Sequence, residues 1–148
     1  MERVSGLRFV VVGAGRSGLA LTRFLLDQGG DVVLTDNRSE GLDPEVREMG
    51  RRGARLDLGG HDEAAFTRAD RVLVSPGVPL ALPALESARR TGVAVWGEIE
   101  FASRFLKGRI IGITGTNGKS TTTTLTGLLL SGGGLDAVAC GNLGTPLI

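Results

Sequence analysis

The sequence has only one cysteine, one histidine and two lysines among its 148 residues. Cys140 has no second cysteine to pair with in the chain, which fits a reducing compartment. His61 has no cysteine or second histidine to form a metal constellation with. We therefore expect His61 to occupy a surface or helix-capping position rather than to act as a metal ligand or catalytic base.

Excess charge of one sign and long apolar runs are also lacking. The formal net charge is +1, which excludes the strongly basic footprint of a nucleic-acid-binding domain. The first apolar run is too short for the core of a signal peptide, and no run approaches the ~20 apolar residues of a membrane span. We expect a cytoplasmic protein that binds neither nucleic acid nor membrane.

Short apolar runs rich in valine and isoleucine alternate with segments of helical spacing. Parallel strands need crossover connections, and helices must cover both faces of the sheet, so this alternation predicts an α/β fold with a parallel sheet. Ligands of such sheets bind at the carboxyl ends of the strands. The runs expected to form strands are residues 8–12, 31–36, 71–75, 93–97, 109–114 and 136–140.

A glycine-rich loop follows the first expected strand, where Gly13, Gly15 and Gly18 form G-x-G-x-x-G. The first glycine permits a tight turn, the second lets a phosphate approach the backbone, and the third lets helix and strand pack closely. Asp36, at the end of the second strand, is placed to meet a ribose or a base. On these residues alone NAD binding leads, and a turn without a ligand or another phosphate-bearing ligand are the alternatives. Arg38 weakens the NAD interpretation, because it suits a 2′-phosphate or a different nucleotide.

A second loop, GTNGKST at residues 115–121, predicts another phosphate site. In a P-loop, backbone amides surround the phosphates, the lysine reaches the β- and γ-phosphates, and the hydroxyl binds Mg²⁺. These roles would fall to Lys119 and Ser120, with Thr121 contacting the α-phosphate at the helix N-terminus. Ile113 stands where the general pattern has glycine, but an apolar run before the loop and a leucine-rich helix after it support the assignment.

The two loops divide the chain near residues 103–107. We expect a Rossmann-like domain at residues 1–106 and the start of a P-loop domain at residues 107–148. The helix after the P-loop is expected to turn a stripe of Leu125, Leu128 and Leu129 toward a core. About 40 residues are too few to close that core alone, so we expect the sequence to stop inside its second domain.

With both loops in one chain, the sequence resembles the Mur ligases of peptidoglycan synthesis, which share the TGTNGK(S/T) loop. It is most similar to the branch of the family that adds D-glutamate. The resemblance covers the whole chain, but the chain covers only the N-terminal part of such a ligase. The motifs that carry it are GAGRSG after the first strand, DNR after the second, SPGV at residues 75–78, GEIEF at residues 97–101 and GNLG at residues 141–144.

The resemblance implies an ATP-dependent ligase that joins D-glutamate to UDP-N-acetylmuramoyl-L-alanine through an acyl phosphate, and hence a role in cell-wall biogenesis, cell shape and cell division. It implies ATP and Mg²⁺ as cofactors, a monomer, and a first domain that holds UDP rather than NAD. The rest of the P-loop domain and the C-terminal, amino-acid-binding domain are absent, so these residues alone are expected to be inactive. The alternatives are another Mur-type ligase and an NAD(P)-binding oxidoreductase domain, although the oxidoreductase leaves the second loop unexplained.

The resemblance also implies a role for particular residues. Lys119 would be the catalytic residue that stabilises the transferring phosphoryl group, and Ser120 would bind Mg²⁺. The residues expected to bind ATP are Gly115, Thr116, Asn117, Gly118, Lys119, Ser120 and Thr121. The residues expected to bind the UDP substrate are Arg16, Ser17 and Gly18 near the pyrophosphate, Asp36, Asn37, Arg38, Ser75, Pro76 and Gly77 near the uridine, and Asn142 at the reacting end.

Overall fold

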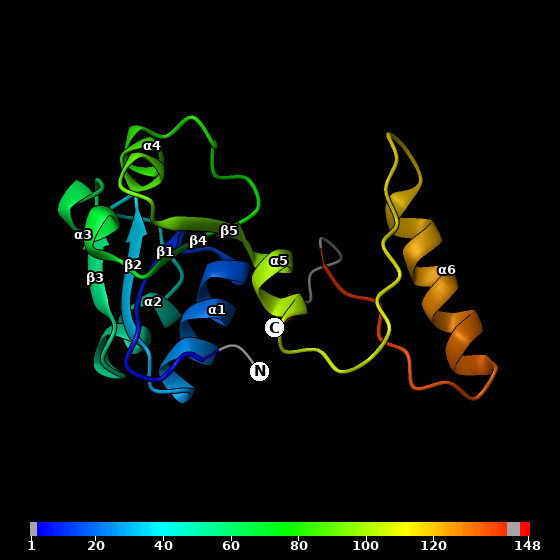
Figure 1. Ribbon diagram of the computed structural model, residues 1–148. Coiled ribbons are helices and arrows are strands. Elements are labelled where there is room, and N and C mark those ends of the chain that lie inside the picture. Colours follow the sequence, from blue (N-terminus) through cyan, green and yellow to red (C-terminus); the bar gives the residue numbers. More distant parts are fainter. Residues whose placement is uncertain (1–2, 142–145) are drawn as a thin grey trace. The chain divides into compact units, whose positions relative to one another are not determined.

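The computed structural model describes residues 3–141 and 146–148. The chain forms two units, one of Met1–Phe105 with Ile148 and the other of Leu106–Leu147. The first unit contains a sheet with helices on both faces, and the second is built around one long helix (Figure 1). No helix of the described residues is long and apolar enough to cross a membrane.

The first unit is organised by a five-stranded sheet in the order β3-β2-β1-β4-β5. Every neighbouring pair is parallel, which confirms the predicted α/β fold. The order is that of a doubly wound, Rossmann-like sheet, in which the chain starts at the centre and builds outward in both directions. The strands are β1 (Arg8–Val12), β2 (Asp31–Asp36), β3 (Arg55–Leu58), β4 (Arg71–Val74) and β5 (Ala94–Gly97).

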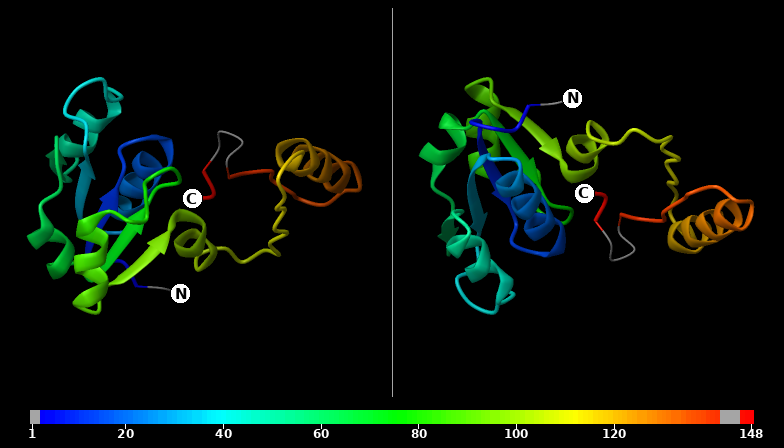
Figure 2. Two further views of the ribbon diagram at one scale, coloured as in Figure 1. Left: turned by 90° about the horizontal axis from the view of Figure 1, so that it is seen from above. Right: turned by 90° about the horizontal axis from the view of Figure 1, so that it is seen from below.

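Five helices cover the two faces of this sheet (Figures 1 and 2). They are α1 (Arg16–Asp27), α2 (Glu45–Arg51), α3 (Glu63–Arg68), α4 (Pro83–Arg90) and α5 (Glu98–Ser103). Side chains of a strand point alternately to opposite faces. Phe9 and Val11 of β1 accordingly belong to the core under α1, α2 and α5, and Val10 and Val12 belong to the core under α3 and α4. Burial on both faces explains why β1 is a continuous apolar run.

The starts of the helices differ in a way that matters for function. The Asp62 side chain caps α3 by accepting a hydrogen bond from the Ala64 N–H at 3.0 Å. Pro83 opens α4, where its lack of an N–H costs nothing. Helix α1, in contrast, begins after Gly15 with no side-chain cap. Its first N–H groups remain available to a ligand.

Strand β3 was not predicted from the sequence. It is a four-residue edge strand in which Arg55 and Asp57 alternate with Leu56 and Leu58. Only one neighbour, β2, pairs with it. Because an edge strand is only partly buried, its sequence lacks the apolar run that marks the central strands.

The second unit departs from two sequence predictions. Helix α6 (Lys119–Gly132) is present, but residues 109–114 and 136–140 do not form the expected strands. A strand requires a hydrogen-bonded neighbour, and neither segment pairs in a sheet within the part of the chain that is described. The predicted core-facing stripe is also wrong for this unit, since Leu125, Leu128 and Leu129 are 54, 65 and 76% exposed. The unit is too small to enclose them.

Candidate nucleotide-binding site

The candidate site begins at the carboxyl edge of the sheet. The last residue of β1, Val12, lies opposite Thr35 of β2 and Val74 of β4, so the loops after these three strands emerge side by side. The chain winds to one side from β1 to β2 and to the other through β4. Ligands of doubly wound sheets bind where the strand order reverses in this way, which here is between β1 and β4.

The glycine loop after β1 has a conformation that only glycine tolerates well. Gly13 has φ +96°, in the left-handed region. A Cβ on Gly18 would lie 1.7 Å from the carbonyl oxygen of Gly13, so no side chain fits there. A Cβ on Gly15 would meet no atom within 4 Å. The space at Gly15 is therefore open on the side that a phosphate could approach.

The start of α1 completes an anion site at this loop. The first intrahelical bond at this end runs from the Leu19 N–H to the Gly15 carbonyl at 2.9 Å. The N–H groups of Arg16, Ser17 and Gly18 precede it and have no partner inside the helix. With the positive end of the helix dipole, these groups favour a negatively charged ligand. Arg16 is exposed, which adds a positive charge at the same place.

Asp36 is the last residue of β2 and is only 5% exposed. Its Oδ2 accepts hydrogen bonds from the Ala14 N–H at 2.8 Å and from Arg38 Nη2 at 3.0 Å. Its Oδ1 accepts from the Arg38 backbone N–H at 2.9 Å and from Arg38 Nε at 3.0 Å. Burial acts to raise the pKa of Asp36, but these hydrogen bonds and the Arg38 charge outweigh it and lower the pKa to about 2. The same pairing raises the pKa of Arg38.

The loop after β4 joins the glycine loop through Ser75, whose hydroxyl donates to the Gly13 carbonyl at 3.2 Å. Pro76 and Gly77 follow on the surface. Beside them is a hollow of about 500 Å³ between this loop and the segment from Val95 to Glu100. At the carboxyl edge of the sheet, the buried hydroxyl of Ser75 therefore lies close to this hollow.

His61 lies near the same edge but is held in the packing. Its Nδ1 is 2.8 Å from Thr35 Oγ1, and its ring stands edge-on against Phe66. Of the two positions expected for His61, a surface position or a helix cap, the cap is supplied by its neighbour, Asp62, and His61 itself is partly exposed. Across the described ranges, no group of three or more histidine, cysteine, aspartate or glutamate residues could hold a metal ion.

The P-loop belongs to the second unit. Gly118 has φ +75° and precedes α6, which begins at Lys119 without a side-chain cap. Lys119 Nζ donates to the carbonyls of Gly115 and Thr116, the latter at 3.4 Å. The first N–H groups of α6 and the hydroxyls of Ser120 and Thr121 are exposed around this turn. The arrangement fits a phosphate group with Mg²⁺, since Mg²⁺ usually keeps several waters and takes few protein ligands.

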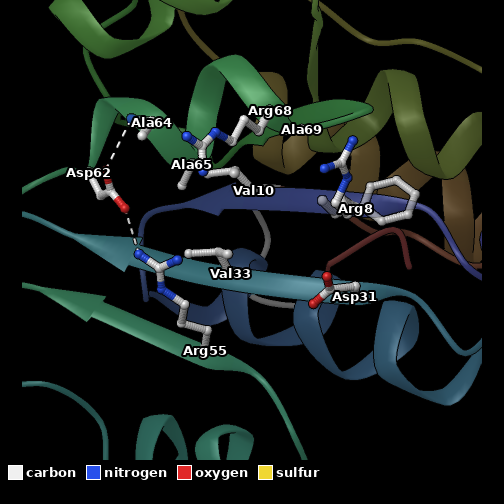
Figure 3. A pocket seen from close by; sticks show the side chains of 11 residues that line it. Arg8, Val10, Asp31, Val33, Arg55, Asp62, Ala64, Ala65, Arg68 and Ala69 are labelled. Carbon is white, nitrogen blue, oxygen red and sulfur yellow. Dashed lines mark hydrogen bonds and ion pairs between the residues drawn. The ribbon is translucent and has the colours of Figure 1, made fainter.

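A second hollow, of about 200 Å³, lies between α3 and the sheet (Figure 3). Arg8 and Arg55 are the first residues of their strands, so this hollow is at the amino ends, opposite the glycine loop. Arg55 donates to Asp62 at 2.6 Å, and this bond, together with the Ala64 N–H, lowers the pKa of Asp62. Because Arg55 and Asp62 are paired with each other, we assign this hollow to the packing of α3.

The three loops at this edge carry all the residues of the first unit that were predicted to bind the UDP substrate: Arg16, Ser17, Gly18, Asp36, Asn37, Arg38, Ser75, Pro76 and Gly77. Asn142 lies outside the described residues. Sequence reasoning missed Ala14, whose backbone N–H joins the glycine loop to Asp36. A contact made by a backbone group leaves no side-chain signal in the sequence.

The first unit is a doubly wound, Rossmann-like α/β domain, and it is followed in the chain by the GTNGKST loop and its helix. A family model described as "Mur ligase MurD-like, N-terminal domain" matches residues 7–97. The chain belongs to this family.

Similar proteins agree with that assignment. A UDP-N-acetylmuramoylalanine--D-glutamate ligase from Syntrophotalea carbinolica is 51% identical over the whole chain, which spans 33% of that relative. A protein of the same name from Anaeromyxobacter dehalogenans is 52% identical over 97% of the chain and 31% of the relative. The chain therefore spans about a third of the length of these relatives.

Solved structures show the same fold. A pseudomurein peptide ligase type C from Methanothermus fervidus matches with a TM-score of 0.58 and 29% identity, over 87% of this chain and 27% of that one. The UDP-N-acetylmuramate-alanine ligase MurC from Thermotoga maritima matches with a TM-score of 0.57 over 84% of this chain and 29% of that one. At 22% identity, the second match bears on the fold alone.

Proposed function

We propose that this chain is the substrate-nucleotide domain and the beginning of the ATP-binding domain of a UDP-N-acetylmuramoylalanine--D-glutamate ligase. The observation that carries the proposal is the 51% identity to a relative of that name, which extends through both phosphate loops. The first unit would hold the UDP end of the substrate, and the second would hold the phosphates of ATP.

The geometry of the first unit supports a diphosphate ligand. No side chain caps the N–H groups at the start of α1, and the space around the Cβ position of Gly15 is open, so a phosphate could approach the backbone closely there. The uridine would extend from there over Asn37 and Arg38 and along the loop of Ser75, Pro76 and Gly77. Adjacent loops at one edge of the sheet would thus bind the pyrophosphate and the base.

In the second unit, Gly115–Thr121 would bind ATP. Phosphoryl transfer depends on positioning and charge neutralisation, and a P-loop lysine next to Mg²⁺ supplies both. Lys119 would neutralise charge on the transferred phosphoryl group, and the Ser120 hydroxyl would hold Mg²⁺. In the ligase reaction, ATP phosphorylates the carboxylate of the UDP substrate, and the amine of D-glutamate displaces the phosphate to form the amide.

Calorimetry tests the proposal. UDP and UDP-N-acetylmuramoyl-L-alanine should bind to the protein, and NADH should not. NADH binding without UDP binding would overturn the assignment in favour of an oxidoreductase domain. In the intact protein, phosphate release from ATP should require both UDP-N-acetylmuramoyl-L-alanine and D-glutamate. Faster release with another amino acid would instead identify a different Mur-type ligase.

A further inference from the structure

The chain leaves the first unit through a cluster of aromatic side chains. Helix α5 ends at Ser103, and the N–H groups of Arg104 and Phe105 still donate to carbonyls of this helix, at 3.1 and 3.0 Å. The Phe105 ring packs on Phe24 of α1 and on Phe101, with ring centroids 4.9 and 5.0 Å apart. Aromatic rings attract each other at such distances. Because Phe101 is fully buried, Phe105 is anchored to the core of the first unit.

Arg104, the residue before Phe105, is anchored by its side chain. Its guanidinium carbon lies 4.0 Å from the centre of the Trp96 ring on the edge strand β5. A cation at this distance over an indole ring is attracted by the ring electrons. Glu100, one turn earlier in α5, is 3.7 Å from Arg104 Nη2. A strand and a helix of the first unit thus hold Arg104, although 40% of its side chain is exposed.

The anchoring stops at Phe105. Leu106 is 42% exposed, and Lys107 and Gly108 are exposed as well. Within the part of the chain that the structure describes, residues 106–114 have no hydrogen bond, ion pair or ring contact. The change from an anchored to an unanchored backbone therefore falls between Phe105 and Leu106, which is also where the two units divide (Figure 1).

Such a boundary has the properties of a hinge. Hinges consist of a few loop or terminal residues that absorb backbone rotation while the packed units on either side stay rigid. In the proposed function, the UDP substrate and ATP are bound by different units, and reacting atoms must come within about 3.5 Å of each other. The connection between the units must therefore bend, and the anchored residues decide where the bending begins.

We propose that Arg104 and Phe105 form a clamp that holds the chain on the first unit, and that residues 106–108 are the pivot about which the second unit turns during the reaction. The role of this turn in catalysis rests on the proposed function. The position of the pivot rests on the contacts of Arg104 and Phe105 alone.

Limited trypsin digestion of the intact protein locates the pivot, because trypsin cuts after arginine and lysine. The chain offers Arg104 in the clamp and Lys107 in the pivot, and exposed segments without anchoring contacts are cut first. Cleavage after Lys107 should be roughly ten-fold faster than cleavage after Arg104, which requires the clamp to open. Phe105→Ala should bring the two rates to within about two-fold of each other, because it removes both ring contacts. Leu106→Ala, one residue beyond the clamp, is the matched control and should leave the two rates as they are in the wild type.

Three outcomes of the digestion would overturn the inference. They are cleavage after Arg104 as fast as after Lys107 in the wild type, no cleavage at either residue, and an unchanged ratio of the two rates in Phe105→Ala.

A substitution in the pivot tests its role in the reaction. Gly108→Pro fixes one backbone dihedral of the pivot and restricts the residue before it. It should lower kcat roughly ten-fold and leave the affinities for UDP and ATP unchanged, since each nucleotide is bound within one unit. Gly108→Ala is the matched control, because its methyl group meets no atom within 4 Å and the Gly108 backbone is not left-handed. It should keep the wild-type kcat.

Wild-type kcat in Gly108→Pro, or a loss of nucleotide affinity that accounts for the lower rate, would overturn the role of the pivot. If the wild-type protein does not bind UDP, the proposed function fails, and the digestion still decides the position of the pivot. If it binds UDP and the digestion gives the wrong pattern, the inference alone is lost.

Discussion

The hydroxyl of Ser75 donates a hydrogen bond to the carbonyl oxygen of Gly13 at 3.2 Å, although 62 positions separate the two residues. Ser75 directly follows β4, and Gly13 directly follows β1. The bond therefore crosses the point at which the strand order reverses. It fixes two loops of the candidate site against each other.

We expect Ser75→Ala to weaken UDP binding more than it weakens the fold. Loss of one neutral hydrogen bond costs about 1 kcal/mol of unfolding free energy. The freed glycine loop should also bind the diphosphate less tightly. Ser87→Ala is the matched control, because both serines are 8% exposed but Ser87 lies in α4. Urea unfolding and UDP calorimetry on both variants check this. Equal UDP affinities in the two variants would contradict the role of Ser75.

Two glycines of the same loop should respond in opposite ways to alanine. Gly18→Ala places a methyl group 1.7 Å from the Gly13 carbonyl, so we expect the first unit to lose several kcal/mol of stability or to fail to fold. Gly15→Ala meets no neighbour within 4 Å, and its φ of −86° suits alanine. It should keep wild-type stability and lose UDP affinity, because its methyl group occupies the space for the phosphate.

The control for the glycine prediction is Gly60→Ala, which follows another strand at the same edge and also has open space around its Cβ position. It should change neither thermal stability nor UDP binding. Full UDP affinity in Gly15→Ala would mean that the diphosphate does not lie over this loop.

The sequence predicted the features that follow from local chemistry. Central strands such as β1 are buried on both faces and therefore read as apolar runs. The glycine loop was recognisable because its conformation excludes other residues at Gly13 and Gly18. The leucines of α6 were correctly assigned to a helix, but the prediction that they face a core failed. The second unit is too small to enclose these leucines.

What could not be predicted depends on pairing between distant parts of the chain. The edge strand β3 is defined by its pairing with β2 rather than by its own composition. Asp36 was recognised as a site residue from its place at the end of the second strand. The hydrogen bonds that its carboxylate accepts from Arg38 and Ala14 form only when the two loops are brought together. A carboxylate in that sequence position would otherwise be taken for a ligand contact.

Because of Asp36, the unfolding free energy of the first unit should depend on pH in the acid range. A carboxylate whose pKa is lowered in the folded state stabilises the fold above its unfolded value of 3.8, and this stabilisation is lost as the pH falls through about 2. The difference in unfolding free energy between the wild type and Asp36→Asn should therefore be largest near neutral pH and shrink between about pH 4 and about pH 2. Denaturant titrations across this range measure it.

Asp31→Asn is the control for this pH dependence, because Asp31 lies exposed at the other end of the same strand. A surface substitution of this kind should change the unfolding free energy by no more than about 0.5 kcal/mol. If the difference in unfolding free energy between the wild type and Asp36→Asn stayed constant across the acid range, the charge of Asp36 would not stabilise the fold.

The two lysines of the chain provide the sharpest test of the second loop. Lys119 opens α6 at the candidate ATP site, whereas Lys107 precedes it in an exposed connection. In the intact protein, Lys119→Ala should lower turnover by about a hundred-fold or more, because it removes the positive charge that stabilises the transferring phosphoryl group. UDP-substrate affinity should stay close to that of the wild type, because the residues proposed to contact the pyrophosphate and the uridine belong to the first unit. Lys107→Ala should change neither turnover nor UDP-substrate affinity.

Wild-type turnover in Lys119→Ala would show that the P-loop lysine takes no part in the reaction. A loss of UDP affinity in parallel with the loss of turnover would mean that the two nucleotide sites do not act separately.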